Sequence, residues 1–108
     1  MKNCVVSALC LLLTSAVAMA DDGLLARGKQ IFSEQAQPSC AICHTLSDAG
    51  STGAIGPDLD ELKPSRQQVH DAVRSGVGVM PAFEETLSAE DINAVALYVA
   101  TVTGGATD

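Results

Sequence analysis

Aromatic residues are scarce in this 108-residue sequence, which has no Trp, one Tyr and two Phe. A chain of this length forms at most one ordinary domain, and so small a domain is marginal on its own apolar core. Domains of this size usually gain stability from disulfides, a metal or a cofactor. Because large side chains are so few, we expect a buried cofactor to supply part of the bulk of the core.

Basic residues are also few. After residue 20 the sequence has five Lys or Arg against thirteen Asp or Glu, a net charge of −8. This balance excludes nucleic acid as a natural partner, because binding to phosphates requires a basic surface. A protein partner attracted by this charge would present a basic docking patch.

The one long apolar run lies at the N-terminus. Lys2 precedes the run Val5 to Leu13, and Ala18-Met19-Ala20 has the small-x-small pattern of a cleavage site. This layout predicts a secretory signal peptide over residues 1–20, with a mature domain over residues 21–108. We therefore expect a periplasmic protein with no stable membrane insertion after cleavage. The alternative is an uncleaved N-terminal anchor.

Cysteine is scarce once the signal peptide is removed, because only Cys40 and Cys43 remain. A framework of several disulfides is thereby excluded. The two cysteines belong to the run Cys40-Ala41-Ile42-Cys43-His44, which is a c-type haem attachment signal. Two thiols with this spacing form thioether bonds to the vinyl groups of one haem, and the adjacent His presents a ring nitrogen to the iron.

Three other interpretations of the two cysteines remain. A thioredoxin-like redox pair would follow a strand in a βαβ pattern, which this sequence lacks. Structural zinc needs four ligands, and Cys40, Cys43, His44 and His70 would have to supply them although Cys43 and His44 are adjacent. A single disulfide between Cys40 and Cys43 is the third.

The apolar pattern predicts an all-α domain with three helices and long loops, and no alternating strand pattern is visible. The first helix is expected from about Asp22 to Ala36, with Gly28 on its apolar face. The second begins at Pro64-Ser65 with a capping-box pattern and stops near Ser75-Gly76. The third begins at Ser88 and ends at Gly104-Gly105. Residues 46–60 are expected to form a loop, because glycines and Pro57 interrupt them.

Met80 is the one methionine of the expected mature chain, and it lies in a Gly-rich stretch before Pro81. A lone Met often fills a core, but a loop in this position is free to bring a thioether to a metal. We therefore favour Met80 as the second axial ligand of the iron. The alternatives are His70, which is expected to face solvent from the second helix, and an open coordination site.

The sequence resembles the class I (mitochondrial-type) small cytochromes c over nearly all of the mature chain. The matching features occur in the family's order, and they include a Gly-Pro-Asp-Leu segment after the haem motif and a Met-Pro pair in the distal loop. These features are Gly28 with Phe32; Cys40, Cys43 and His44; Gly56 to Leu59; Met80-Pro81; and Tyr98.

The resemblance implies a small cytochrome c fold, in which three main helices and loops wrap around one covalently bound haem c. It implies covalent attachment through Cys40 and Cys43, with His44 and Met80 as axial ligands. The Pro57 carbonyl would accept a hydrogen bond from His44, and Gly28 would pack closely on the last helix near Tyr98. The loop segments are further similar to the haem subunits of periplasmic sulfite dehydrogenases.

The predicted function is one-electron transfer between redox partner proteins, with no catalytic residue and no enzyme activity of its own. The neutral region around Ala41-Ile42 and Val77-Val79-Ala82-Phe83 is the expected contact surface. The alternatives are a permanent haem subunit of a dehydrogenase, such as one oxidising sulfite, and a ligand-binding or peroxidatic haem protein. The latter would require that Met80 leave the iron.

Overall fold

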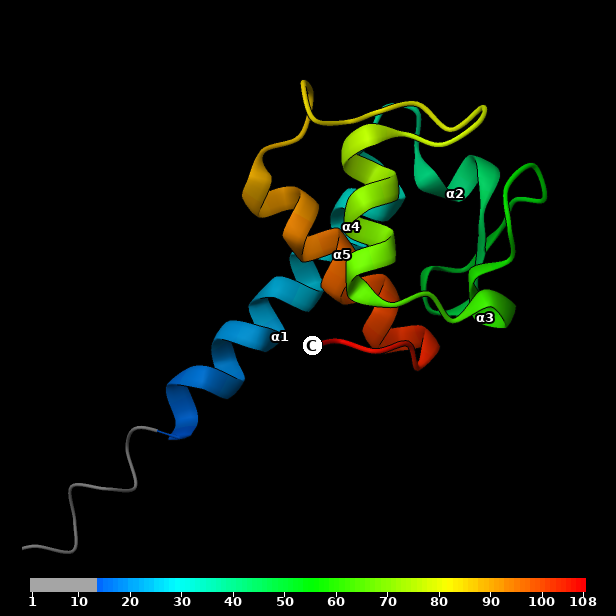
Figure 1. Ribbon diagram of the computed structural model, residues 1–108. Coiled ribbons are helices and arrows are strands. Elements are labelled where there is room, and N and C mark those ends of the chain that lie inside the picture. The colour runs from blue at the N-terminus through cyan, green and yellow to red at the C-terminus, as the bar shows by residue number, and fades with distance from the viewer. Residues whose placement is uncertain (1–13) are drawn as a thin grey trace, which may run out of the picture.

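The computed structural model describes residues 14–108, and side chains from residue 21 onward. The expected signal peptide, residues 1–20, therefore lies largely outside the described part. The three long helices expected from the sequence are α1, α4 and α5, and they form the frame of an all-α domain (Figure 1). The helical segments, which include the π-helical turn η1 and the 3-10 turn η2, are α1 (Thr14–Gln30), η1 (Ile31–Gln35), α2 (Cys40–Cys43), η2 (Ser47–Ala49), α3 (Leu59–Leu62), α4 (Arg66–Ser75) and α5 (Ala89–Thr103).

The first helix begins earlier than expected. α1 starts at Thr14, continues through Asp22, and passes into η1, which ends at Gln35 with Ala36 as its extended C-cap. The end of the predicted helix is therefore correct and its start is wrong. Residues 14–22 contain no proline and no glycine, so the backbone meets no residue that would stop a helix there.

The second and third helices begin at the predicted caps. The Ser65 hydroxyl accepts from the Gln68 backbone N–H, and the Gln68 side chain accepts from the Ser65 N–H, so both halves of the capping box are present. Ser88 accepts from the Asp91 N–H in the same way, and Gly104 ends α5 in the left-handed region. Each such cap contributes about 1 kcal/mol to helix stability.

The predicted loop over residues 46–60 contains regular structure, which corrects the expectation that the chain has no strands. β1 (Thr45–Leu46) pairs antiparallel with β2 (Ser51–Thr52), and Thr45 lies opposite Thr52. Strands of two residues are too short to show alternation in a sequence. Gly50, at φ +66°, ends the intervening 3-10 turn η2, and Asp58 caps α3 through the N–H groups of Asp60 and Glu61.

α1 and α5 cross at Gly28. A Cβ atom at this position would lie 2.5 Å from the Cβ of Tyr98 and 2.9 Å from the backbone carbon of Ala94, and it would also overlap the Ala94 carbonyl oxygen. These distances confirm that Gly28 packs closely on the last helix. At the same crossing the rings of Phe32 and Tyr98 meet edge to face, with centroids 6.2 Å apart.

Apolar side chains of η1 and α5 make most of the core, and Leu25 of α1 packs against it. Phe32 and Tyr98 are the largest fully buried residues, and Ile31, Leu46, Val95 and Val99 follow them. Arg27 closes the outer side of the crossing through two hydrogen bonds to the Asp91 carboxylate, at 3.1 and 3.0 Å. Among the residues that the structure describes, no helix has both the length and the apolarity that a membrane crossing requires.

Gly28→Ala is expected to lower the free energy of unfolding by about 1–3 kcal/mol, because the added methyl group meets backbone atoms of α5 that cannot move independently. Gly23→Ala is the matched control, since nothing lies within 4 Å of the Cβ position on the same helix. It should stabilise the protein by up to about 1 kcal/mol through helix propensity. Denaturant titration of the haem-loaded protein measures both, and equal effects would contradict the close crossing.

Tyr98 joins α5 to the β1–β2 connection. Its phenol donates a hydrogen bond to Asp48 at 2.5 Å, and Lys29 of α1 lies 3.5 Å from the same carboxylate. Burial, together with the hydrogen bond to Asp48 and the negative charges of Asp48 and Asp60, raises the pKa of Tyr98 above its ordinary value of 10. The neutral phenol is therefore favoured in the folded state.

The raised pKa of Tyr98 predicts a loss of stability at alkaline pH. Below about pH 10 the phenol is neutral in both states and its contribution is complete; above pH 10 the unfolded chain loses this proton while the folded protein keeps it, so stability falls. Tyr98→Phe should cost about 1 kcal/mol at neutral pH. The difference from wild type should shrink above pH 10 in denaturant titrations. Parallel curves across that range would refute the assignment, and Tyr98 is the chain's one tyrosine.

Candidate functional site

The haem attachment motif forms a single helical turn, α2, that is fixed to the end of the first helix. Ser39 precedes it, and the Ser39 hydroxyl accepts from the Ala41 N–H at 3.3 Å. The same hydroxyl lies 3.1 Å from the carbonyl oxygens of Phe32 and Ser33, to which it can donate. One serine therefore both caps the turn and ties it to η1, whose Phe32 is part of the core.

Cys40 and Cys43 are half-buried free thiols at the two ends of this turn. Burial raises the pKa of the Cys40 thiol to about 11, so this thiol is protonated at neutral pH. Cys40 and Ala41 also pack against the hydrophobic core. The turn thus presents two thiols in a partly apolar environment.

His44 follows the turn and has its ring held from two sides. Its Nδ1 lies 2.8 Å from the Pro57 carbonyl oxygen, which can only accept, so Nδ1 carries the proton and Nε2 carries the lone pair. Gly56 lies against the ring: a Cβ there would be 2.6 Å from the His44 Cε1. The ring is therefore oriented with one nitrogen engaged by the protein and the other available to a metal.

The connection between β2 and α3 packs closely against the motif. The Gly56 N–H donates to the Cys43 carbonyl at 2.7 Å. A Cβ at Gly53 would lie 2.5 Å from the Ile42 carbonyl oxygen. Asp60 fixes the far side of this region by accepting from the Ser47 N–H and hydroxyl at 2.9 and 2.8 Å. Glycines at 53 and 56 let this segment lie directly on the motif.

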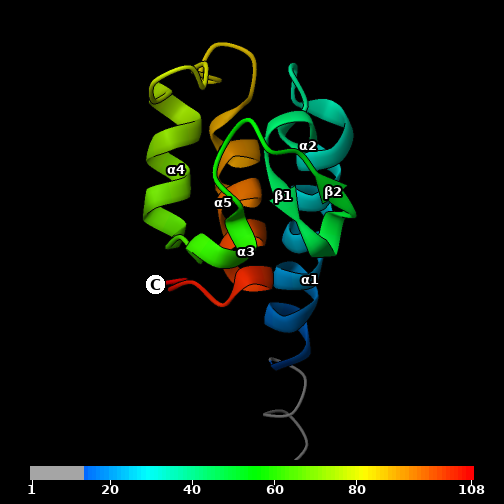
Figure 2. The same ribbon diagram turned by 90° about the vertical axis from the view of Figure 1, so that its right-hand side faces the viewer.

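Met80 lies in the loop between α4 and α5, as the sequence predicts. Its backbone exchanges two hydrogen bonds with Val77, at 2.9 and 3.1 Å, which makes a two-residue turn. The Met80 side chain is half-buried and packs against the same core that Cys40 and Ala41 contact. Both views place this loop and α2 at the same end of the molecule, away from the C-terminus (Figures 1 and 2).

Large aliphatic side chains are exposed in the segments that flank the motif and Met80. We call Ile42, Ile55, Val77 and Val79 the aliphatic rim; they are 59%, 69%, 64% and 92% exposed. Two thiols, an imidazole nitrogen, a thioether and this apolar rim together fit haem, which needs covalent attachment, axial ligands and apolar contacts. Phe83, which we expected in the contact surface, is instead 4% exposed and belongs to the core.

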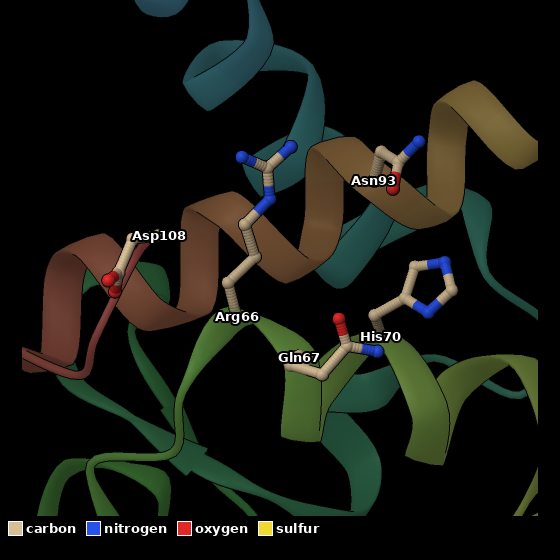
Figure 3. A pocket seen from close by; sticks show the side chains of 5 residues that line it. All are labelled: Arg66, Gln67, His70, Asn93 and Asp108. Atoms are coloured by element: carbon tan, nitrogen blue, oxygen red, sulfur yellow. The ribbon is translucent and has the colours of Figure 1, made fainter.

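In the described part of the chain, the side chains considered as ligands of a structural zinc ion do not form a metal site. None of its His, Cys, Asp and Glu side chains gather in groups of three or more that would hold a metal ion, so the four zinc ligands considered above do not come together. His70 is not fully solvent-facing: its side chain is 29% exposed, and Nδ1 lies 3.3 Å from Asp71. It lines a hollow of about 300 Å³ between α4, α5 and the C-terminal segment, with Arg66, Gln67, Asn93 and Asp108 (Figure 3).

Sequence reasoning missed the part that the glycines play in this site. Gly53, Gly56 and Gly76 count only as loop markers in the sequence, whereas each lies against the motif or the Met80 loop. A signal was present, because glycines occur immediately before Pro57 and four residues before Met80. Spacing by itself, however, does not reveal which backbone atoms approach them.

Comparisons with known proteins find a matching family model and a similar solved structure. Residues 23–99 match the family model described as "Cytochrome C oxidase, cbb3-type, subunit III". The crystal structure of the c-type cytochrome SorU from Sinorhizobium meliloti superposes with a TM-score of 0.74 at 53% identity, covering 81% of this chain and 99% of that one.

Curated relatives are also similar. The chloroplastic cytochrome c6 of Chlamydomonas reinhardtii is 34% identical over 82% of this chain, and cytochrome c6 of Microcystis aeruginosa is 40% identical over 67% of this chain and 89% of its own length. The chain spans 62% of the length of the Chlamydomonas protein. It spans 30% of the cbb3-type oxidase subunit FixP of Rhizobium etli, to which it is 32% identical.

Proposed function

This chain is a small class I c-type cytochrome, a member of the family that the subunit III model describes, with one covalently bound haem c, and from that premise we propose that it is a periplasmic one-electron carrier. Membership of the cytochrome c family indicates that the chain is an electron-transfer protein. The observation that carries the finer proposal is the Met80 loop, which is folded back on α4 at the same end of the molecule as α2, the turn that His44 follows.

Four residues would hold the cofactor. Cys40 and Cys43 would form the two thioether bonds, and His44 and Met80 would bind the iron. The Pro57 carbonyl accepts a hydrogen bond from the Nδ1–H of His44, which keeps the lone pair on Nε2 and makes the imidazole a stronger donor to a metal. When bound, haem supplies an iron that gains and loses one electron at a time.

The protein would determine which side chains bind the iron and would keep other ligands away from it. A thioether is a soft, neutral donor, so a His/Met pair favours reduced iron and raises the reduction potential. With His44 and Met80 both bound to the iron, small molecules would have no free position there. This supports electron transfer over the ligand-binding or peroxidatic alternative.

Periplasmic location rests on the sequence. Residues 1–20 have the layout of an export signal, and residues 21–108 contain every residue assigned to the cofactor. Covalent haem attachment takes place outside the cytoplasm in bacteria, so export is the appropriate context for the motif. Cleavage after Ala20 would remove the first seven residues of α1 and leave the crossing at Gly28 intact.

The aliphatic rim is the proposed contact surface for redox partners. The segments 36–47, 49–57 and 75–83, which contain its four residues, have no Asp, Glu, Lys or Arg. A net charge of −8 elsewhere on the mature chain would attract a partner with a basic patch over long range, whereas the contact itself would be apolar. Electron-transfer interfaces are commonly small and transient.

A second candidate function is the permanent haem subunit of a dehydrogenase, such as one oxidising sulfite. Its support is the similarity of the loop segments Gly53 to Leu59 and Gly76 to Pro81 to the haem subunits of periplasmic sulfite dehydrogenases. Purification of an affinity-tagged chain from periplasm distinguishes the two. The carrier proposal expects the chain alone after a moderate-salt wash, and a stoichiometric second polypeptide that persists would replace it with the subunit proposal.

Met80→Ala is expected to abolish the weak sulfur-to-iron charge-transfer band of the oxidised protein and to lower the reduction potential. Imidazole should then bind at least about tenfold more tightly than it binds the wild-type protein, because the apparent affinity scales with the fraction of molecules whose iron is open. Val79→Ala is the control: this neighbouring side chain is 92% exposed and carries no iron ligand, so the variant should keep the charge-transfer band and the wild-type imidazole affinity. A wild-type protein that lacks the band at neutral pH would overturn Met80 ligation.

A further inference from the structure

Gly76 ends α4 and begins the loop that carries Met80. Its backbone has φ +74° and ψ 164°, a conformation that residues with a Cβ essentially do not adopt. Even Asn and Asp, which tolerate the left-handed helical region, are unsuited to this one. The direction in which the chain leaves α4 therefore depends on glycine at this position.

The space at Gly76 is closed as well. A Cβ atom would lie 2.8 Å from the Met80 carbonyl oxygen, 2.8 Å from the Ala82 nitrogen and 3.0 Å from the Pro81 carbonyl carbon. All three are backbone atoms of the Met80 loop, so a rotamer change cannot relieve the overlap. A side chain at residue 76 would have to push residues 80–82 away from α4.

The loop is fastened at both ends to the last turn of α4. The Gly76 N–H donates to the Ala72 carbonyl, and the Phe83 N–H donates to the Val73 carbonyl, both at 2.8 Å. Between these anchors Val77 and Met80 form their two-residue turn, in which Gly78 has φ +57°. Because both ends are fixed, a displacement at Gly76 cannot be absorbed outside the loop and must move the backbone of Met80.

We propose that Gly76 is the positioning residue for Met80: the absence of a side chain lets residues 80–82 lie directly on the end of α4, and this contact sets where the thioether is presented. The proposal rests on Met80 ligation as given under the proposed function. It adds a residue that touches neither the iron nor the haem attachment bonds and acts only through the backbone of the distal loop.

The test is Gly76→Ala in the haem-loaded protein. We expect loss of the sulfur-to-iron charge-transfer band and imidazole binding about tenfold or more tighter than in wild type, as for Met80→Ala. Gly104→Ala is the matched control, because Gly104 also has a positive φ, +83°, but nothing lies within 4 Å of its Cβ position. It should lose stability and keep both the band and the wild-type imidazole affinity.

The double variant Gly76→Ala with Met80→Ala separates positioning from a general structural role. If Gly76 acts through Met80, the first change has no further effect on imidazole affinity once the thioether is gone. If Gly76→Ala does not accumulate, the double variant should still accumulate like Met80→Ala, because a loop no longer held at the iron is free to shift. Failure of both variants to accumulate would overturn the proposal.

The outcomes also separate this proposal from the function it rests on. A wild-type protein with the charge-transfer band and a Gly76→Ala variant that retains it would overturn the positioning role alone. A wild-type protein without the band would remove Met80 ligation, and the positioning role with it.

Discussion

The crossing of α1 and α5 at Gly28 is the contact on which the other elements depend. The missing side chain lets the backbones touch, and this contact buries Phe32 and Tyr98 against each other. From Phe32 the chain runs through η1 to Ser39, whose hydroxyl fixes the motif turn to the Phe32 carbonyl. From Tyr98 the phenol reaches Asp48 and fixes the β1–β2 connection. Both routes lead from one helix crossing to the haem attachment region.

Glycines also allow close contacts at the site itself. Gly53 and Gly56 let the segment after β2 lie on the backbone of Ile42 and on the ring of His44, and Gly76 lets the distal loop lie on α4. In each case a backbone contact replaces the side-chain packing that a chain with few large residues cannot supply. The positions of His44 and Met80 are therefore set by main-chain contacts, which adjust less readily than side chains do.

Charge and apolar surface are separated along the chain. Ion pairs such as Arg27 with Asp91 and Arg74 with Glu84 lie on the helices and their flanks, whereas the segments that carry the aliphatic rim have no acidic or basic residue. In the proposed docking, charge would act on a partner at a distance, where its effect is screened by salt. The proposed contact near the cofactor would be governed by apolar area, which salt does not screen.

The amino-acid pattern alone predicts the all-α class, the caps at Ser65 and Ser88, the haem motif and the place of Met80 in a loop before Pro81, because each depends on residues within a few positions of one another. The tertiary structure decided the rest. The two-residue strands, the burial of Phe83, the contact of Tyr98 with Asp48 and the closeness of Gly76 to residues 80–82 depend on segments brought together by folding. A local sequence pattern does not show which backbone atoms come into contact when helices and loops pack.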